Sequence, residues 1–576
     1  MTSENDRTGG RILVDSLRRQ GCDRVFCVPG ESYLDVLNAL YDAPEINLIV
    51  CKHEGAAANM AEADGRLTGR PGICFVTRGP GATHASIGVH TARENSTPMV
   101  LFIGQVDRGF IDREAFQEID YRQMFGGMAK WVAQIEDAAR IPEYVFRAFQ
   151  TATSGRPGPV VLALPEDMLT QVAAVSDTQT FRAARSAPSE DDLAALAAEL
   201  AQASRPLVIL GGGGWTPDAC GDMAAFIKSN GLPVAVSFRR QDLFDNECEH
   251  YAGHLGLGVN PRLAEHVRSA DLLVVVGSRL SEVTTSGYSI LEAPRPHQRL
   301  VHIHADPEEL GHVYQAALMI NSGMAEFARA AKALPGVGHA GWKSWVESLR
   351  HDFEAFVRPP DAGSEHRGVH LATVVSALSE TLSPDAIVCN GAGNYTLWVH
   401  RFHKYRQLGT ELAPVSGAMG YGLPASVAAK LRHPNRTVVC FAGDGCFLMY
   451  PQELSTAVQF GAAIIVLIVN NGMYGTIRMH QERRYPGRVS GTSIENPDFV
   501  ALARSFGAYA ERVSETEGFL DAFARAARAG VPALLELCVD ADQITPGVRL
   551  TRTERLVGVS SPTGVSVPSK EDSRPS

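Results

Sequence analysis

Residues 437–446, Thr-Val-Val-Cys-Phe-Ala-Gly-Asp-Gly-Cys, place an aspartate between two glycines directly after an apolar, β-branched run. The apolar run 464–469 ends in the same way, in Asn470-Asn471-Gly472, and 24 residues separate the two motifs. The segment between them is long enough for a helix, so both runs are expected to be strands of one parallel sheet. Ligands bind outside the carboxyl ends of such strands. The two motifs therefore predict an α/β fold with a site that contains Asp444 and Asn471.

The chemistry of these two motifs indicates what the site binds. A carboxylate, an amide oxygen and backbone carbonyls are hard oxygen ligands that suit Mg²⁺, which usually keeps phosphate oxygens and water as well. Glycine lets the backbone approach a diphosphate, and a helix N-terminus suits the diphosphate charge. Each motif alone is a common turn. Their occurrence together at two strand ends favours a site for magnesium and a diphosphate.

The whole chain divides into three α/β blocks joined by two polar stretches rich in Pro, Ala and Gly. Short apolar runs near Gly or Pro alternate with helix-length segments, which is typical of parallel sheets buried on both faces. We expect three doubly wound parallel-sheet domains, at residues 1–175, 190–335 and 365–555. Residues 556–576 are rich in Ser, Pro and Gly without periodicity, and they are expected to form a disordered tail.

Composition excludes several classes of protein. Of 576 residues, 45% are hydrophobic and 20% are charged, which rules out a mainly disordered chain and a small disulfide scaffold. The formal net charge of −11 argues against nucleic acid as the main partner. The longest apolar run, 462–469, is far shorter than the roughly 18 residues of a membrane helix. The N-terminus lacks a signal-peptide core and the ten cysteines are scattered singly, so we expect a cytoplasmic protein without a membrane partner.

The spacing of the two motifs resembles the signature of thiamine diphosphate (ThDP) enzymes. The order of the blocks resembles the pyrimidine-binding, central and diphosphate-binding domains of that family. Five further motifs are similar to the acetolactate synthase large-subunit branch: His53-Glu54-Gly55-Ala56-Ala57, Gly79-Pro80-Gly81-Ala82-Thr83, Ala115-Phe116-Gln117-Glu118, residues 417–424 and residues 450–454. The resemblance implies a carboligase or decarboxylase of a 2-oxo acid, that is, a C–C bond transferase or lyase that uses ThDP and Mg²⁺.

The resemblance also assigns roles to single residues. Asp444, Asn471 and the main-chain carbonyl of Met473 are expected to bind Mg²⁺. Glu54 is expected to hydrogen-bond the pyrimidine ring and so promote loss of the thiazolium C2 proton, although an acid that begins a helix is also favoured by the helix dipole. The remaining cofactor contacts are expected from Gly30, Asn394, Tyr395, Gly417, Met419, Gly443, Gly445 and Cys446, with Met419 as the apolar support that bends the cofactor.

Three more residues are candidates for contact with intermediates or substrate, each with a structural alternative. Gln117 faces the cofactor in the family, or is a surface amide. Arg78 stands where the branch carries a small polar residue, and it suits a carboxylate or phosphate, or is a solvated loop arginine. His480 stands where the branch carries a Trp that selects the acceptor, and it is a proton shuttle or a helix-surface residue. These departures leave other 2-oxo acid decarboxylases and aldehyde lyases of the superfamily open.

The sequence of the central block does not decide which nucleotide binds there, or whether one binds at all. Gly211-Gly212-Gly213-Gly214 after a strand, Arg279 and residues 302–306 are compatible with FAD, while family members that bind ADP or nothing there fit as well. An FAD-linked oxidoreductase is therefore a rival, although the chain lacks a G-x-G-x-x-G run followed by an acid about 20 residues on. In the family the active site lies between two subunits, so a homodimer or homotetramer is expected, with a 2-oxo acid and a carbonyl acceptor as small-molecule partners.

Overall fold

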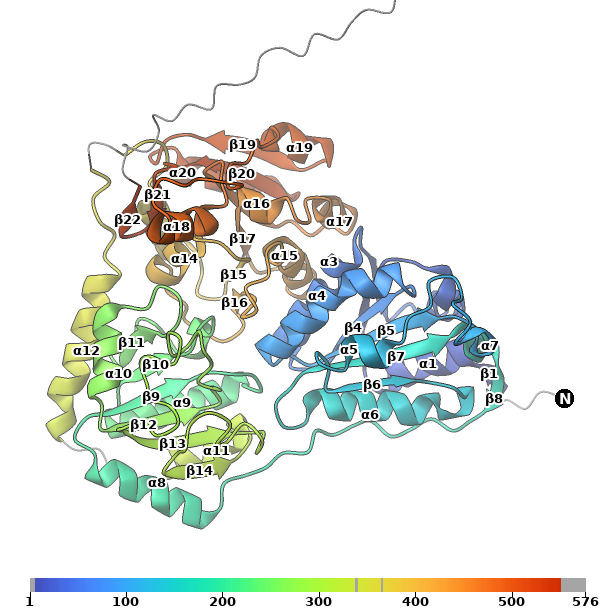
Figure 1. The fold of residues 1–576 in the computed structure, drawn as a ribbon, viewed down its shortest axis with the longest axis horizontal. Coiled ribbons are helices and arrows are strands. Elements are labelled where there is room, and N and C mark those ends of the chain that lie inside the picture. Colours follow the sequence, from blue (N-terminus) through green and yellow to red (C-terminus); the bar gives the residue numbers. More distant parts are fainter. Residues whose placement is uncertain (1–5, 337–339, 364–365, 551–576) are drawn as a thin grey trace, which may run out of the picture.

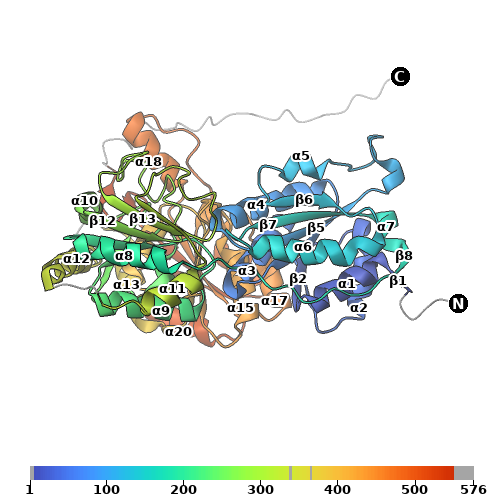
Figure 2. The same ribbon diagram turned by 90° about the horizontal axis from the view of Figure 1, so that it is seen from below.

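The computed structural model describes residues 6–336, 340–363 and 366–550. Three six-stranded parallel sheets follow one another along the chain, and helices cover both faces of each (Figures 1 and 2). This arrangement confirms the predicted fold class. The boundaries between the domains stay predictions, and the expected tail at 556–576 lies outside the described residues. Within the described ranges, no helix is long and apolar enough to cross a bilayer.

The N-terminal sheet has the strand order β3-β2-β4-β5-β7-β6. Strands β4, β5 and β7 are buried over their whole length, because helices cover the sheet on both sides. The strands are β2 (Arg24–Cys27), β3 (Asn47–Val50), β4 (Gly72–Val76), β5 (Met99–Gln105), β6 (Trp131–Gln134) and β7 (Pro159–Pro165), and β1 (Asp6–Thr8) pairs antiparallel with β8 (Val172–Ala174). The helices are α1 (Gly9–Arg19), α2 (Leu34–Tyr41), α3 (Glu54–Thr68), α4 (Pro80–Asn95), α5 (Tyr121–Phe125), α6 (Ile141–Thr153) and α7 (Glu166–Thr170).

The central sheet has a different order, β11-β10-β9-β12-β13-β14, which is the order of dinucleotide-binding domains. Helix α12 lies in the stretch between the expected central and C-terminal domains, and it packs against β11 and α10 of this sheet. The strands are β9 (Pro206–Leu210), β10 (Val234–Val236), β11 (Tyr251–His254), β12 (Leu272–Val276), β13 (Arg299–His304) and β14 (Leu318–Asn321). The helices are α8 (Glu190–Gln202), α9 (Pro217–Asn230), α10 (Pro261–Ser269), α11 (Met324–Lys332) and α12 (Lys343–Phe356).

The C-terminal sheet repeats the order of the N-terminal one, as β16-β15-β17-β18-β20-β19, and its two motif strands β17 and β18 are direct neighbours. The strands are β15 (Ile387–Asn390), β16 (Glu411–Leu412), β17 (Val438–Gly443), β18 (Ile465–Asn470), β19 (Tyr509–Val513) and β20 (Ala533–Cys538), followed by the hairpin of β21 (Gln543–Thr545) and β22 (Val548–Arg549). The helices are α13 (Leu371–Thr381), α14 (Thr396–Phe402), α15 (Gly422–Arg432), α16 (Asp444–Phe447), α17 (Glu453–Gln459), α18 (Gly475–Arg484), α19 (Phe499–Ser505) and α20 (Phe519–Arg528).

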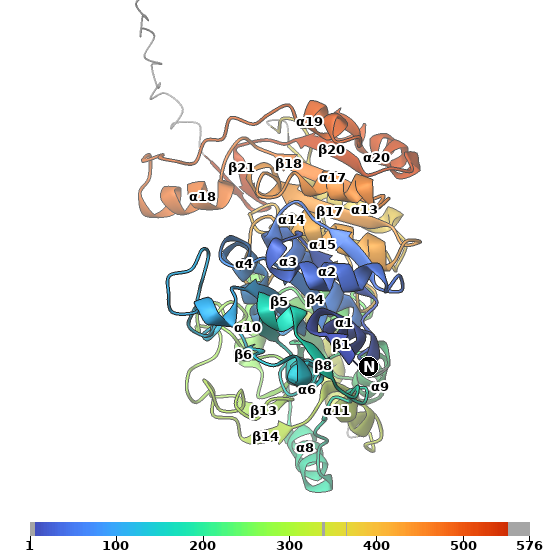
Figure 3. The ribbon, with the colours of Figure 1, turned by 90° about the vertical axis from the view of Figure 1, so that its right-hand side faces the viewer.

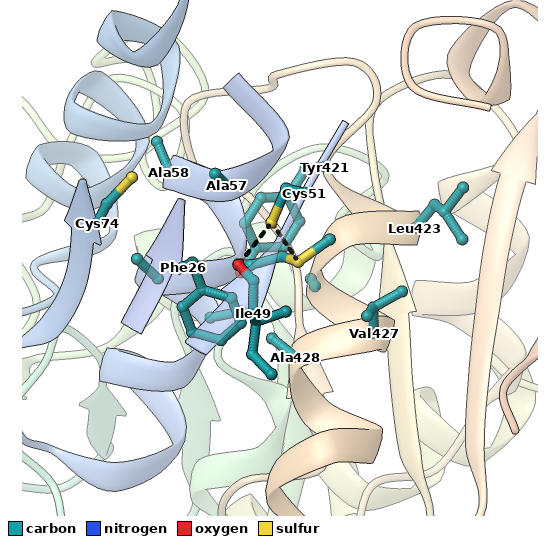
Figure 4. Packing of buried hydrophobic residues seen from close by; sticks show 14 of the residues in the cluster. Phe26, Ile49, Cys51, Ala57, Ala58, Cys74, Tyr421, Leu423, Val427 and Ala428 are labelled. Carbon is teal, nitrogen blue, oxygen red and sulfur yellow. Dashed lines mark hydrogen bonds between the residues drawn. The ribbon is translucent and has the colours of Figure 1, made fainter. Parts of the chain in front are cut away.

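The N-terminal and C-terminal domains share one apolar core. Helix α3 packs against α15, and small side chains on α3 allow this close approach (Figure 3). Figure 4 shows the shared cluster, to which the N-terminal domain contributes Phe26, Ile49, Cys51, Ala57, Ala58 and Cys74, and the C-terminal domain Tyr421, Leu423, Val427 and Ala428. The two domains therefore hold each other in a fixed orientation within one chain.

A buried carboxylate adds a polar link to this core. Glu62 of α3 is fully buried and accepts hydrogen bonds from Tyr421 (2.5 Å), Asn95 (2.8 Å) and Thr97 (2.6 Å). Tyr421 belongs to the C-terminal domain and the other three residues to the N-terminal domain. A buried charge is tolerated when hydrogen bonds satisfy it, so this network joins the two domains at a defined register.

Replacing Tyr421 with Phe removes one of the three donors and leaves a lone pair of buried Glu62 unsatisfied. We expect the free energy of unfolding to fall by about 1–3 kcal/mol. Urea unfolding of the intact protein measures the change, and Tyr41→Phe at an exposed position is the control. Equal unfolding midpoints for the Tyr421 variant and the wild type would show that the link does not stabilise the junction.

Candidate active site

A cavity of about 260 Å³ lies at the carboxyl ends of the C-terminal strands. Its walls come from the loops that follow β15, β17, β18 and β20. Ten of the fifteen residues proposed from the sequence line it: Asn394, Tyr395, Gly417, Met419, Gly443, Asp444, Gly445, Cys446, Asn471 and Met473. The two motifs that predict the site thus lie on the walls of one cavity.

Asp444 is the electrostatic centre of the cavity. It is 2% exposed, and its carboxylate accepts hydrogen bonds from the backbone N–H groups of Gly445 (2.9 Å) and Gly472 (2.8 Å). Burial raises its pKa, and no Lys, Arg or His of the described residues forms an ion pair with it. A buried carboxylate without a counter-cation, beside the amide of Asn471, is a donor set that fits Mg²⁺.

Asn496 completes this group, and sequence reasoning missed it. Its Nδ2 donates to Asp444 Oδ2 (2.8 Å) and to Asn470 Oδ1 (2.9 Å), so it links the loops after β17 and β18. Its own Oδ1 is buried and has no hydrogen-bond partner among the described residues. Asn496 stands 25 residues after Asn471 in a segment without a motif, so only the folded chain reveals its place.

Side chains between the loops fix the cavity wall. The Tyr395 hydroxyl accepts from the N–H of Gly391 (2.9 Å) and lies 3.4 Å from Cys446 Sγ. Asn394 binds protein groups with both ends of its amide: Oδ1 accepts from Thr476 (2.8 Å), and Nδ2 donates to the carbonyl of Ile544 (3.0 Å). The side chains of these predicted contacts therefore hold the loops of the cavity wall together.

The remaining five predicted residues do not line this cavity. Gly30, Glu54, Arg78 and Gln117 follow four strands of the N-terminal sheet at their carboxyl ends. His480 lies on the exposed surface of α18. One chain therefore carries two sets of site residues, which do not meet within the chain.

Glu54 is the first residue of α3, and its side chain is 14% exposed. The helix is capped by His53, whose Nδ1 accepts from the N–H of Gly55 (3.0 Å). His84 of α4 places its Nδ1 2.9 Å from Glu54 Oε2, a contact that sequence reasoning missed although His84 directly follows the motif 79–83. Glu54 is thus held by a neighbouring helix and is still open to solvent on one side.

Arg78 is engaged by the protein itself. Its guanidinium pairs with Glu31 (3.1 Å) and Glu166, and its Nε donates to the carbonyl of Phe116 (3.3 Å). Gln117, with φ +66°, follows in the same loop, and its backbone lies against Gly79. The geometry therefore supports Arg78 as the anchor of the loop that carries Gln117, because its charge is already compensated by two carboxylates.

The central domain has the strand order of a dinucleotide-binding fold, and the glycine run after β9 makes close contacts with other loops. A Cβ on Gly212 would lie 2.0 Å from the carbonyl oxygen of Gly277, and a Cβ on Gly213 would lie 2.3 Å from that of Ser96 in the N-terminal domain. Trp215 is 8% exposed and donates from Nε1 to the Gly211 carbonyl (2.7 Å). The glycine run thus serves close backbone contacts between loops and domains.

The other residues considered for FAD are also occupied. Arg279 donates to the carbonyl (3.1 Å) and the carboxylate (3.1 Å) of Glu94 in the N-terminal domain. His302 is buried and donates from Nε2 to the Ser278 carbonyl (2.8 Å), and burial lowers its pKa to about 4. Both side chains considered for contact with FAD therefore have protein partners in this arrangement.

The fold and the cavity define an enzyme that binds thiamine pyrophosphate, which is another name for ThDP. Three models of this family match in chain order: the N-terminal TPP binding domain at residues 7–124, the central domain at 193–331 and the C-terminal TPP binding domain at 391–537. The chain belongs to the thiamine pyrophosphate enzyme family and is a ThDP-dependent enzyme.

Its relatives include acetolactate synthases. It is 32% identical over 547 residues to the acetolactate synthase large subunit of Parasynechococcus marenigrum (strain WH8102), covering 92% of this chain and 87% of that protein. It is 31% identical over 565 residues to the acetolactate synthase large subunit of Corynebacterium glutamicum, at 94% and 88% coverage. It is 28% identical to the acetolactate synthase isozyme 2 large subunit of Escherichia coli (strain K12), at 92% and 95% coverage.

Because protein groups fill the glycine turn of the central domain, we expect the purified enzyme to carry no flavin. The visible absorption spectrum of the protein as isolated, and of the supernatant after denaturation, measures this directly. Dialysis against excess FAD provides the second arm, and it should leave the bound flavin at background. A yellow protein with stoichiometric FAD would show that the turn opens to accept the nucleotide.

Proposed function

We propose that the protein is a ThDP- and Mg²⁺-dependent carboligase or decarboxylase that acts on a 2-oxo acid, with chemistry similar to that of acetolactate synthase. The observation that carries this proposal is the cavity around Asp444, where a buried carboxylate without a counter-cation meets Asn471 and glycine-rich loops. Relatives named acetolactate synthase, which match more than 90% of the chain, support the choice of chemistry.

The residues suit their proposed roles. Asp444, Asn471 and the carbonyl of Met473 would hold Mg²⁺, and the loops with Gly443, Gly445 and Gly417 would face the cofactor. When bound, ThDP supplies a nucleophilic carbon and an electron sink for cleavage or formation of the bond next to a carbonyl. Met419, half-buried in the wall, provides apolar support. The carboxyl group of Glu54 is 14% exposed and contacts His84, and a largely buried carboxyl group suits general acid–base catalysis.

We propose a homodimer as the smallest active unit, with a homotetramer as a larger assembly of the same dimer. No described residue of the N-terminal domain lines the cavity, which supports a second copy as the source of Glu54, Gly30 and Gln117. Phe116, 74% exposed in the loop that carries Gln117, is an apolar side chain suited to such a contact. His480, exposed on α18 at the edge of the cavity, would meet substrate only in that assembly.

The partners we propose are a 2-oxo acid and a carbonyl acceptor, in a cytoplasmic enzyme without nucleic acid. All ten cysteines are free thiols, as a reducing compartment requires. A simple 2-oxo acid decarboxylase or an aldehyde lyase is the second candidate. His480 favours this second candidate, because it stands where the acetolactate synthase branch carries a Trp that selects the acceptor.

The test of the proposed function is a panel of 2-oxo acids, offered with ThDP and Mg²⁺ and with or without aldehyde acceptors. We expect CO₂ release with at least one acid, and a ligation product distinguishes a carboligase from a decarboxylase. Glu54→Gln should lower turnover by on the order of 10² or more, while ThDP still binds. Glu517→Gln at an exposed position is the matched control. A ThDP-loaded wild type that is silent across the panel would overturn the proposal.

Mixed oligomers test the shared site. The Glu54→Gln and Asp444→Ala chains are each inactive when expressed alone. In a hybrid dimer formed by co-expressing the two, one site receives intact Asp444 from the first chain and intact Glu54 from the second. Random pairing makes half of the dimers hybrids with one intact site each, so about a quarter of the wild-type activity is expected. Activity no higher than that of the single variants, in hybrids confirmed by affinity tags, would place the site within one chain.

A further inference from the structure

The cavity proposed for ThDP faces a charge imbalance. Its described lining residues include the carboxylate of Asp444 and no Lys or Arg, while the second lining carboxylate, Asp540, is paired with Arg549 (2.8 Å). A diphosphate carries more negative charge than one Mg²⁺ ion offsets when a carboxylate also binds that ion. Among the described lining side chains, His366 and His370 are the two imidazoles, whose ring N–H groups can donate hydrogen bonds to an anion.

The two histidines lie next to the proposed magnesium loop. Val369 N donates to the Cys538 carbonyl at the end of β20 (2.9 Å), and Val539 N donates to the Asn470 carbonyl at the end of β18 (3.2 Å). Neighbouring strands are about 4.8 Å apart, so the backbone of Val369 lies about two strand spacings from that of Asn470. Backbone hydrogen bonds therefore fix both histidines on one wall of the cavity.

One ring nitrogen of each histidine forms no hydrogen bond with the described residues. The Nδ1 of His370 lies 2.8 Å from Thr373 Oγ1, which leaves its Nε2 for another partner. The side chain of His366 is 9% exposed, and its Nε2 is buried without a hydrogen-bond partner among the described residues. The two rings meet edge to face, with centroids 5.0 Å apart. A buried, unsatisfied Nε2 is costly unless a ligand completes it.

Two neighbouring features suit an anion at this wall. His370 is the N-cap of the 11-residue helix α13, and its side chain makes no capping hydrogen bond, so the helix N-terminus keeps N–H groups without a side-chain partner. Asp540, whose Oδ2 is 4.0 Å from His366 Nδ1, is itself paired with Arg549 (2.8 Å) and accepts from the N–H of Arg367 (3.2 Å). Its charge is therefore offset by groups outside the cavity.

We propose that His366 and His370 bind a phosphate group of the ThDP diphosphate through their Nε2 atoms, beside the N-terminus of α13. The ligand chemistry is that of a phosphate ester or diphosphate anion, for which imidazole N–H groups are charge-assisted donors. This inference rests on the proposed function, because it takes ThDP as the ligand of the cavity.

Titration calorimetry on the full-length protein tests the proposal, with Mg²⁺ present throughout. The ligands are ThDP, inorganic diphosphate, inorganic phosphate and thiamine, which lacks phosphate. His366→Gln and His370→Gln should each weaken ThDP and diphosphate binding by roughly tenfold, which is the loss of one charge-assisted hydrogen bond, and should leave thiamine binding unchanged. His351→Gln on the exposed face of α12 is the control and should change neither.

The outcomes are distinguishable. Wild-type affinity for ThDP and diphosphate in the double variant would overturn the inference. An equal loss of thiamine affinity would also overturn it, since it would show that the histidines only shape the wall. Tighter binding of inorganic phosphate than of diphosphate by the wild type would also overturn it, because the two histidines would then belong to a site for a different phosphate ligand. If the wild type binds no ThDP at all, the proposed function itself fails.

Discussion

The site depends on one uncompensated charge, the Asp444 carboxylate at the end of β17. Backbone N–H groups and the side chain of Asn496 donate hydrogen bonds to it, but no Lys, Arg or His of the described residues forms an ion pair with it. Such a group is stable in a folded chain only where a ligand or a shifted pKa reduces its charge, and here burial does raise the pKa. The loops after β15, β18 and β20 lie around this carboxylate and form the walls of the cavity with it.

The shared core between the N-terminal and C-terminal domains imposes the second constraint. Small side chains on α3 bring α15 close, and Glu62 with Tyr421 fixes the register between the two domains. This packing holds the strand ends that carry Glu54 away from the cavity at Asp444, since none of the lining residues comes from the N-terminal domain. In the single chain none of the N-terminal site residues lines the cavity, and the proposed active unit of two chains rests on this separation.

Much of this architecture follows from the sequence, and the rest follows from contacts that it does not encode locally. Apolar runs bounded by glycine predicted β17 and β18, because strands buried on both faces need side chains of that kind throughout. The position of Asn496 and the pairing of Arg78 with Glu31 and Glu166 depend on loops distant in sequence, and no periodicity reports them. The glycine run of the central block could not be interpreted from the sequence, since a glycine needed for a ligand and one needed for a neighbouring loop look alike.

The three domains share one kind of fold but differ in the residues at the carboxyl edge of each sheet. Ligands of doubly wound sheets bind at the carboxyl ends of the strands, and all three sheets here offer such an edge. In the C-terminal domain the edge carries oxygen ligands and glycines, and in the N-terminal domain it carries Glu54 and His84. In the central domain, which has the dinucleotide strand order, Trp215 and the contact with Ser96 occupy it. The side chains at this edge therefore distinguish the three sheets more clearly than the order of the strands does.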